Sequence, residues 1–302
     1  MAKWLKIFLT LIVIGAGIIG YYGYHLYDAI NKAYQPSERL KSDKRPSAVD
    51  ISEEPVSILL MGVDKRQHDS GRSDTLMVMT INPKEKTVQM MNIPRDTYME
   101  IPGHGYDKIN HAYAYGGTDL TIRTVENFLD IPIDHYAKVN MEGFRRIVDE
   151  LGGVTVHVPF TFEFRGKLYQ KGKMTLNGDE ALGFAQMRKV DPRGDFGRND
   201  RQQQVIKGIL EKGTSVYAIP KLDNILKHVG ENVVTDISPI EMIQLQRIYS
   251  EMDRKQMKSL HINGTDRTIG GIYYFVVDPQ EKQRIQHKLK HHLRLDSMNT
   301  RR

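Results

Sequence analysis

Residues 141–158, MEGFRRIVDELGGVTVHV, decide the fold class of this 302-residue chain. Apolar side chains recur every three or four positions at the start of this stretch, which predicts an amphipathic helix over residues 141–151. Gly152 and Gly153 end that helix, and the β-branched run at residues 154–158 predicts a strand directly after it. A helix followed at once by a strand is typical of α/β folds, in which helices cover the faces of a sheet.

The remainder of the chain continues this alternation of strand and helix patterns. Strands are predicted at residues 56–63, 75–81, 87–93, 135–139, 258–262 and 271–277. Helices are predicted at residues 120–129, 178–187, 196–210, 239–252 and 279–293. The segment 160–174 alternates and turns at Gly166, which predicts a small hairpin at the edge of the sheet. We therefore expect one α/β domain with a small accessory β-hairpin.

The amino-terminal end predicts a membrane anchor. Residues 7–26, IFLTLIVIGAGIIGYYGYHL, carry no formal charge and are long enough to cross a hydrocarbon core at about 1.5 Å per residue. Lys3 and Lys6 precede this segment and Asp28 follows it, so the positive-inside bias keeps the amino terminus in the cytoplasm. A cleaved signal peptide is the alternative, but its apolar core is usually only about 7–15 residues long and is followed by a small-x-small site.

The expected organisation of the chain follows from this anchor. It comprises a cytoplasmic end over residues 1–6, a transmembrane helix over residues 7–26, a juxtamembrane linker over residues 27–54 and an extracytoplasmic catalytic domain over residues 55–302. The protein would thus lie in the cell membrane with a single pass. The absence of cysteine suits an exported protein without a disulfide framework.

The formal net charge of +6 favours polyanionic partners. Nucleic acid, anionic lipid headgroups and acidic polymers all belong to that class. The predicted anchor argues against a cytosolic or nuclear nucleic-acid binder, so we expect the membrane as a partner and no nucleic acid.

Three clusters of charged residues adjoin apolar elements. They are GVDKRQHDSGRSD at residues 62–74, NIPRDTY at residues 92–98 and MRKVDPRGDFGRNDRQQQ at residues 187–204. Ligands collect beyond strand ends in open α/β sheets, so the first two clusters are expected to share one mouth. The third opens a predicted helix, on which Arg198, Arg201 and Gln202 share a face.

The arginines in these clusters indicate an anionic ligand. Several guanidinium groups from separate loops would repel one another without an anion between them, and their planar donors suit phosphate oxygens. Asp64 and Asp74 could hold Mg²⁺, which takes its other ligands from water and phosphate. Metal and arginines together form the general apparatus of phosphoryl transfer. The alternative is a set of surface salt bridges (Asp64–Arg66, Asp74–Arg72 and Arg198–Asp195), each of which would contribute little stability.

Five blocks of sequence together resemble the LytR–CpsA–Psr family. They are GVDKR…GRSDTLMV, NIPRDTYMEIPG, KINHAYAYGG, GFRRIVDELGGVTVHV and MRKVDPRGDFGRNDRQQQVI, in the order of the family between residues 56 and 206. The resemblance implies a membrane-anchored transferase with a central mixed β-sheet flanked by helices and a hydrophobic pocket for a polyprenyl chain. Its implied reaction moves an anionic glycopolymer, which we expect to be wall teichoic acid, from undecaprenyl pyrophosphate to peptidoglycan.

The resemblance also assigns roles by motif. Asp64 and Asp74 correspond to magnesium ligands. The pyrophosphate ligands correspond to Arg66, Arg72, Arg95, Arg188, Arg198, Arg201 and Gln202. The chain departs from the family where Gln186 and Met99 stand at positions that often carry arginine, and Lys189 and Arg193 are the candidate replacements.

Transfer to an alcohol requires a base that takes the proton of the hydroxyl group. Asp96 is our candidate, and it completes a catalytic set with Asp74 and Arg95. Its alternative roles are an ion pair with Arg95 or a turn cap, and a metal-bound aspartate could serve as the base instead. The apolar segments 120–129 and 144–151 either line a lipid pocket or belong to the core.

Two other functions stay open on the sequence alone. One is a lipid-pyrophosphate hydrolase that uses water in place of the sugar alcohol at the same site. The other is a non-enzymatic membrane-bound regulator, a transcriptional attenuator, which the cytoplasmic amino terminus argues against because the large domain would never meet DNA.

Overall fold

A computed structural model describes residues 41–64, 71–213, 230–253 and 256–295, together with residues 21, 24, 28, 32–36 and 39; of Asp64 it describes the backbone alone. The predicted transmembrane segment, residues 7–26, falls outside this part of the chain except for residues 21 and 24. None of the helices formed by the described residues combines the length and the hydropathy needed to span a membrane.

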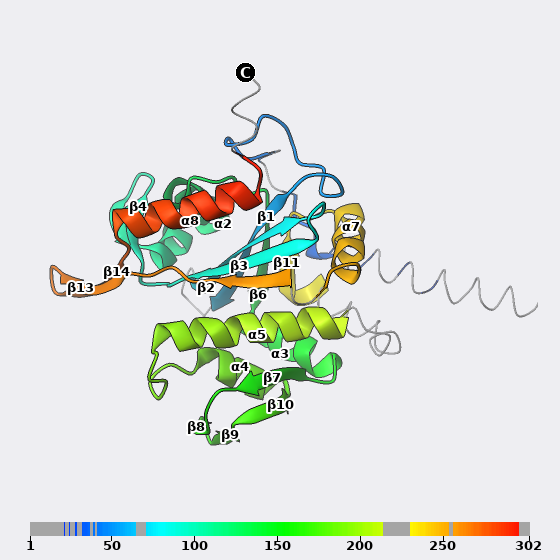
Figure 1. Ribbon diagram of the computed structural model, residues 1–302, viewed down its shortest axis with the longest axis vertical. Coiled ribbons are helices and arrows are strands. Elements are labelled where there is room, and N and C mark those ends of the chain that lie inside the picture. Colours follow the sequence, from blue (N-terminus) through cyan, green and yellow to red (C-terminus); the bar gives the residue numbers. More distant parts are fainter. Residues whose placement is uncertain are drawn as a thin grey trace, which may run out of the picture.

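A six-stranded mixed sheet forms the centre of the molecule (Figure 1). Its order is β11 (Val233–Thr235), β6 (His135–Asn140), β1 (Val56–Asp64), β2 (Arg72–Asn82), β3 (Thr87–Ile93) and β12 (Met257–Leu260). The β1–β6 and β3–β12 pairs are parallel, and the β1–β2, β2–β3 and β6–β11 pairs are antiparallel. The expected central mixed sheet is therefore confirmed.

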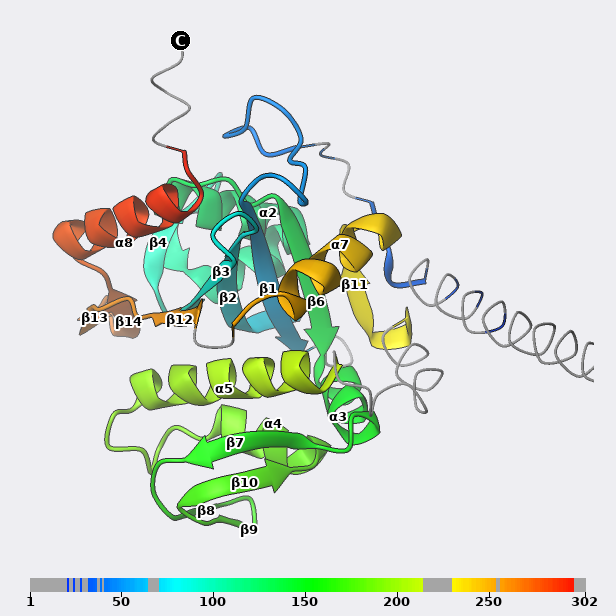
Figure 2. The ribbon, with the colours of Figure 1, turned by 45° about the vertical axis from the view of Figure 1, so that its right-hand side comes forward.

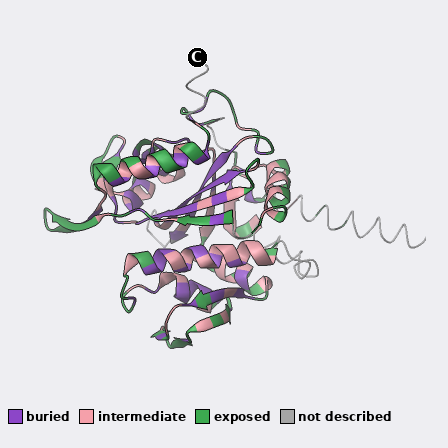
Figure 3. Ribbon diagram, viewed as in Figure 1, coloured by how far each residue is buried: buried purple, intermediate pink, exposed green. Residues whose placement is uncertain are grey.

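Both faces of the sheet are covered, which explains the nearly continuous apolar runs in β1 and β2. Helices α2 (Ile109–Leu129) and α8 (Pro279–His292) pack on the face that carries Leu59 and Val78. Helices α5 (Asp195–Gly213) and α7 (Pro239–Ser250) lie on the opposite face, which carries Ile58 and Met79. Strands β1, β2 and β3 are mostly buried (Figure 3).

A third layer lies beyond α5, on the side away from the sheet (Figures 1 and 2). It contains α3 (Met141–Glu150), α4 (Gly178–Gln186) and the antiparallel pair of β7 (Val154–Val158) and β10 (Gly172–Leu176). The helix–strand stretch that decides the fold class thus forms as predicted, but its strand pairs with β10 and not with the central sheet. Helix α5 contacts β7 and separates it from that sheet.

Three short hairpins complete the domain. The predicted turn at Gly166 is confirmed, since β8 (Phe162–Phe164) and β9 (Lys167–Tyr169) pair across it. The hairpin of β4 (Tyr98–Ile101) and β5 (Gly105–Lys108) was not predicted, because four-residue strands give too short a pattern. The third joins β13 (Thr265–Ile269) to β14 (Ile272–Val276), and β13 is exposed along its whole length (Figure 3).

Helix α2 begins eleven residues before the predicted start at residue 120. A glycine pair interrupts it: Gly116 and Gly117 have non-helical backbone angles, and Gly117 has a φ of 62°. Residues 109–115, before this break, form a separate short helical segment. They belong to the KINHAYAYGG block, which runs from the end of β5 to the glycine pair.

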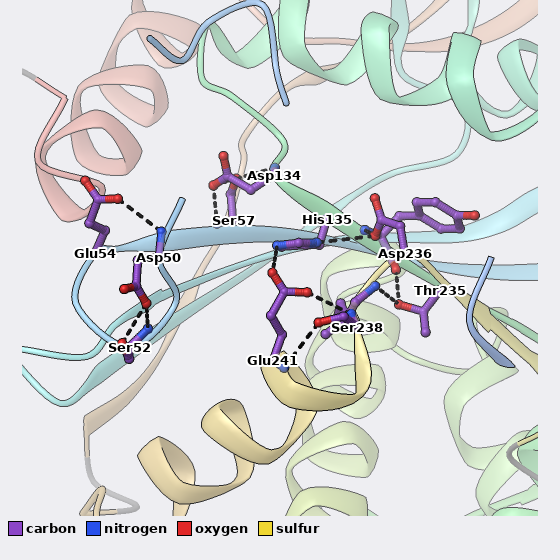
Figure 4. Close-up of polar contacts among 12 residues, drawn as sticks. Asp50, Ser52, Glu54, Ser57, Asp134, His135, Thr235, Asp236, Ser238 and Glu241 are labelled. Atoms are coloured by element: carbon purple, nitrogen blue, oxygen red, sulfur yellow. Dashed lines mark hydrogen bonds and ion pairs between the residues drawn. The ribbon is translucent and has the colours of Figure 1, made fainter. Parts of the chain in front are cut away.

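Residues 41–54, which we call the strap, pack on the domain and do not stand apart from it as the expected linker would. Arg45 donates to the carboxylate of Asp134 at 2.9 Å, and both side chains are almost fully buried. Ile51 is buried in the core on the α7 side of the sheet. Asp134 also accepts hydrogen bonds from the backbone and hydroxyl of Ser57 on β1 (Figure 4). The strap is therefore fastened to the central sheet.

A half-buried histidine joins α7 to the same end of the sheet. His135 at the start of β6 lies 3.5 Å from Asp236 and 3.7 Å from Glu241 (Figure 4). Burial opposes the charged form of this imidazole, but its ion pair with Asp236 and the charges of Glu241 and Asp134 raise its pKa above the ordinary value. Glu241 also completes a capping box with Ser238 at the start of α7.

Candidate active site

A β-bulge presents Asp74 at the end of the central sheet. Gly62 of β1 pairs with Thr75, whereas the next residue, Val63, pairs with Ser73, so Asp74 is the extra residue on β2. Bulges of this kind redirect a side chain and interrupt pairing at functional sites. The Asp74 carboxylate is partly exposed and lines a polar pocket.

The loop after β3 brings Arg95 to Asp74. The Nη1 atom of Arg95 donates to Asp74 Oδ1 at 2.8 Å, and its Nε atom lies 3.5 Å from Asp96 Oδ2. The expectation that these two clusters share one mouth is confirmed for this pair. Asp74 pairs with Arg95 and not with Arg72, the partner that the surface salt-bridge alternative had named.

The Asp96 side chain is more buried than those of Asp74 and Arg95. Lys108 Nζ donates to Asp96 Oδ1 at 2.8 Å, and the Asp96 side chain is 13% exposed. The amide of Phe275 on β14 donates to the carbonyl of Asp96. Asp96 therefore forms the ion pair with Arg95 that was one of its alternative roles. It also forms a shorter ion pair with Lys108.

The start of α5 contributes the second group of cations. Asp195 is the first residue of this helix, and its carboxylate lies 2.7 Å from Arg198 and 3.1 Å from Arg188. The Arg198–Asp195 pair is mostly buried, so it is not a surface salt bridge. Burial lowers the pKa of Arg198; Asp195 opposes this effect, and the positive charges of Arg95 and Arg188 add to it. An anion between these arginines would relieve their repulsion.

Together these elements enclose a polar pocket of about 610 Å³, which we call the arginine pocket. Its charged lining residues are Asp74, Arg95, Arg165, Arg188, Lys189, Asp191 and Arg198. Arg165 was missed by the sequence analysis. Its signal is its place beside Gly166 at the tip of the accessory hairpin, where it has a positive φ of 53°.

Arg201 does not line the arginine pocket, although its partner Asp191 does. Its side chain is completely buried, where Nε donates to the carbonyl of Phe184 at 2.9 Å and the two terminal nitrogens bind the Asp191 carboxylate and the carbonyl of Met187. A Cβ atom at Gly197 would overlap the Asp191 carboxylate, so glycine allows this close approach. Arg201 fastens the segment before α5 to the helix, with its guanidinium fully occupied.

Gln202 does line the pocket, because it follows Arg198 by four residues on α5. Its Oε1 atom accepts a hydrogen bond from Asn92 Nδ2 at 2.7 Å, and the neighbouring Gln203 donates to Asn92 Oδ1 at 2.9 Å. These bonds fix α5 over the end of β3. Of the two candidate replacements, Lys189 lines the pocket, whereas Arg193 pairs with Asp200 at 2.7 Å.

The remaining predicted ligands come from the loop after β1. Arg72 is exposed at the start of β2, where it pairs in register with Asp64, and it does not line the arginine pocket. Arg66 and the side chain of Asp64 lie outside the described part of the protein. The structure therefore brings together Asp74, Arg95, Arg188, Arg198 and Gln202 from the predicted set.

The described residues are compatible with Mg²⁺ that is held partly by a phosphate ligand. Within that part of the chain, no group of three or more His, Asp or Glu side chains is arranged to hold a metal. Mg²⁺ commonly uses only one or two carboxylates together with water and phosphate oxygens. The partly exposed Asp74 carboxylate, beside the backbone end of β1 at Asp64, fits that donor set.

An apolar pocket of about 170 Å³ adjoins the arginine pocket, between the central sheet and the third layer. Its lining includes Leu60, Met77, Val139, Phe144, Leu182 and Val205. Thr75, Met141, Gln186 and Gln202 line both pockets. Of the two segments proposed for a lipid pocket, 144–151 contributes Phe144, whereas Ile122, Val125 and Leu129 of the other segment are core on the opposite face of the sheet.

The sequence and the fold have counterparts among known proteins. A family model described as the LytR_cpsA_psr family matches residues 21–291. The chain belongs to that family. It is 48% identical over 286 residues to the polyisoprenyl-teichoic acid–peptidoglycan teichoic acid transferase TagU of Bacillus subtilis (strain 168), with 94% of this chain and 92% of TagU covered.

Solved structures of family members share the fold. The crystal structure of B. subtilis TagV matches with a TM-score of 0.71 at 43% identity, covering 80% of this chain and 98% of TagV. The LytR-CPS2A-psr family protein YwtF (TagT), from B. subtilis, with bound octaprenyl pyrophosphate lipid matches with a TM-score of 0.70 at 34% identity, covering 86% of this chain and 98% of that one. The resemblance drawn from the five sequence blocks is confirmed.

Proposed function

We propose that this protein is a phosphotransferase that moves wall teichoic acid, an anionic glycopolymer, from undecaprenyl pyrophosphate to peptidoglycan. The wall that the two pockets share carries this proposal, because a charged pocket that opens into an apolar one suits a pyrophosphate joined to a hydrocarbon chain. The relatives support it by name: TagU is a polyisoprenyl-teichoic acid–peptidoglycan teichoic acid transferase, and the TagT structure holds an octaprenyl pyrophosphate lipid.

In the proposed reaction, an acceptor hydroxyl oxygen attacks the phosphorus that bears the glycopolymer. The bond from this phosphorus to the bridging oxygen breaks, and polyprenyl phosphate leaves with the bonding electron pair. Negative charge therefore develops on the leaving oxygen. Arg95, Arg188 and Arg198 would bind the phosphate oxygens and stabilise that charge, with Arg165 closing the pocket from the hairpin side.

Asp64 and Asp74 are the proposed ligands of Mg²⁺. When bound, the ion would supply charge neutralisation on the pyrophosphate oxygens. The ion pair between Arg95 and Asp74 fixes the carboxylate at the mouth of the pocket. Arg66 and Arg72 are further proposed ligands of the phosphates.

Asp96 is the proposed base for the acceptor hydroxyl proton. Arg95 and Lys108 hold its carboxylate on either side, so its oxygens are oriented before the acceptor arrives. With the base in this position, we expect the acceptor to approach from the side of Lys108.

The predicted anchor at residues 7–26 would keep the domain at the outer face of the cell membrane, where a polyprenyl carrier resides. The apolar pocket is small compared with a full undecaprenyl chain, so we expect it to take the isoprene units nearest the pyrophosphate. The rest of the chain would stay in the bilayer.

Transfer is tested with the full-length chain, lipid-linked teichoic acid and Mg²⁺, with and without peptidoglycan oligomers. Polymer attached to the oligomers is the expected product. Polymer released without attachment, even with oligomers present, would show that water is the acceptor and that the protein is a lipid-pyrophosphate hydrolase. An Asp74→Asn variant serves as the control for the site, because it keeps the shape of the side chain and removes its charge.

A further inference from the structure

The KINHAYAYGG block begins at Lys108, the partner of Asp96, yet most of its residues lie outside the two pockets. Its Tyr115 joins ring side chains from β4, β5, the turn between them and β14. We call this group the aromatic platform and define it as Tyr98, His104, Tyr106, Tyr115 and Tyr274. Strands β4 and β14 lie near each other at one end of the molecule (Figure 1).

One half of the platform runs from the core to the surface. The Tyr98 ring lies 4.8 Å from that of Tyr274, which is buried, and 5.2 Å from that of Tyr106. Tyr106 is 61% exposed. A large ring this exposed on a short hairpin adds little to the core, and its packing on Tyr98 presents it in a defined orientation.

The other half is built around Asp107. Tyr115, which is 47% exposed, stacks on His104 with ring centroids 4.5 Å apart and donates its hydroxyl to Asp107 Oδ2 at 2.8 Å. His111 Nδ1 lies 2.7 Å from the same oxygen. Burial opposes ionisation of Asp107, but the hydrogen bonds with His111 and Tyr115 outweigh it and lower the pKa of this carboxyl group. The rings are thus held rigidly beside a carboxylate.

The platform continues directly into the proposed reaction centre. Lys108 Nζ lies 5.6 Å from the centre of the Tyr274 ring while it donates to Asp96. On the other side, Arg72 is near enough for its charge to act on Tyr115. None of the platform residues lines the apolar pocket or the arginine pocket. The platform therefore adjoins Asp96 through Lys108 and lies outside both pockets.

We propose that the aromatic platform binds the glycan chain of the acceptor, with a sugar ring stacked on Tyr106. A pyranose ring has a C–H face that packs on an aromatic face, and hydroxyl groups at its rim that bond to groups such as Asp107 and His111. The anionic donor polymer fits less well, because Asp107 and Glu100 would repel it. This inference rests on the proposed function, since it names where the acceptor of that reaction lies.

The test compares Tyr106→Ala, Tyr106→Phe and Leu168→Ala in the full-length chain. Leu168 is the matched control, because it is 56% exposed on the accessory hairpin, on a different part of the surface. Transfer is followed while the concentration of a peptidoglycan glycan oligomer is varied, and again while the lipid-linked donor is varied. Binding of the same oligomer without donor is measured separately by calorimetry.

For Tyr106→Ala we expect the KM for the oligomer and its Kd to rise about tenfold, equivalent to about 1.4 kcal/mol, with the donor KM unchanged. Tyr106→Phe and Leu168→Ala should behave like the parent protein. An unchanged oligomer KM and Kd in Tyr106→Ala would overturn the inference, and so would an equal rise in the donor KM. A parent protein that binds the oligomer through Tyr106 but transfers nothing would refute the proposed function and leave the platform standing.

Discussion

Replacing Arg201 with methionine should destabilise the fold and leave the arginine pocket intact. Methionine fills much of the same volume, so the change mainly removes the charge and its hydrogen bonds. Asp191, whose side chain is 0% exposed, would stay buried without its partner, and the carbonyls of Phe184 and Met187 would lose their donor.

The magnitude follows from burial. Breaking a fully buried ion pair by removing one partner costs about 3–5 kcal/mol, because the remaining charge is left uncompensated. In a domain of this size, 1 kcal/mol lowers Tm by about 2–4 °C, so the expected decrease is about 6–20 °C. Arg198→Met provides the contrast. Its side chain lines the pocket beside other cations, and Asp195 would keep Arg188 as a partner at 3.1 Å, so its removal should change Tm by only a few degrees.

The assay pairs thermal unfolding with binding of octaprenyl pyrophosphate at a temperature where both variants are folded. Arg201→Met should lose stability and keep its affinity, whereas Arg198→Met should keep its stability and lose affinity by about tenfold or more. The reasoning is refuted if Arg201→Met unfolds like the parent protein and yet fails to bind the lipid. Arg201 would then be the phosphate ligand that the family motif implies.

The other predictions concern the reaction centre, the lipid and pH. Asp74→Ala should abolish transfer while the circular dichroism spectrum and Tm stay close to those of the parent, and retained activity would remove Asp74 from the site. Ala185→Trp, which would fill the apolar pocket, should weaken binding of octaprenyl pyrophosphate about tenfold or more and leave binding of inorganic pyrophosphate unchanged; equal loss of both would argue that the chain binds elsewhere. The pKa of His135 is raised in the folded state. Its ion pairs therefore stabilise the protein fully at pH values below the pKa of the unfolded state, about 6.5. This stabilisation is lost as the pH rises through the pKa of the folded state. His135→Gln should therefore reduce the free energy of unfolding in urea more at pH 5.5 than at pH 8.5, and an equal reduction at both would contradict this role.

Much of the fold followed from local pattern in the sequence. Strands β1, β2 and β3 have apolar runs that predict buried strands. Helix α3 ends just before Gly152 and Gly153, as those glycines predict. The place of β7 was not predictable, because pairing with β10 depends on α5 lying between β7 and the central sheet. Hairpin β4–β5 was missed because each of its strands has only four residues. The earlier start of α2 was missed because the sequence before Gly116 is more polar than a typical apolar helix face.

The candidate site divides in a similar way. Sequence motifs identified Asp74, Arg95, Arg188 and Arg198, which the fold brings to one pocket. Arg201 and Gln202 are consecutive on α5, so their side chains point about 100° apart around the helix axis. Arg201 points toward the buried carboxylate of Asp191, and Gln202 lines the pocket. No local pattern carries that information. The same holds for Arg165, which reaches the pocket only because the accessory hairpin folds over it.

The contacts made before β1 would limit how far the enzyme works from a bilayer. Tyr34 pairs with Thr235 on β11, and Arg39 donates to Glu126 at 2.7 Å, so only residues 27–33 would separate the body from the predicted anchor. Fully extended, seven residues span at most about 25 Å. The reaction centre would therefore meet only glycan strands close to the membrane, where they are newly made, and older strands farther out in the wall would be beyond its reach.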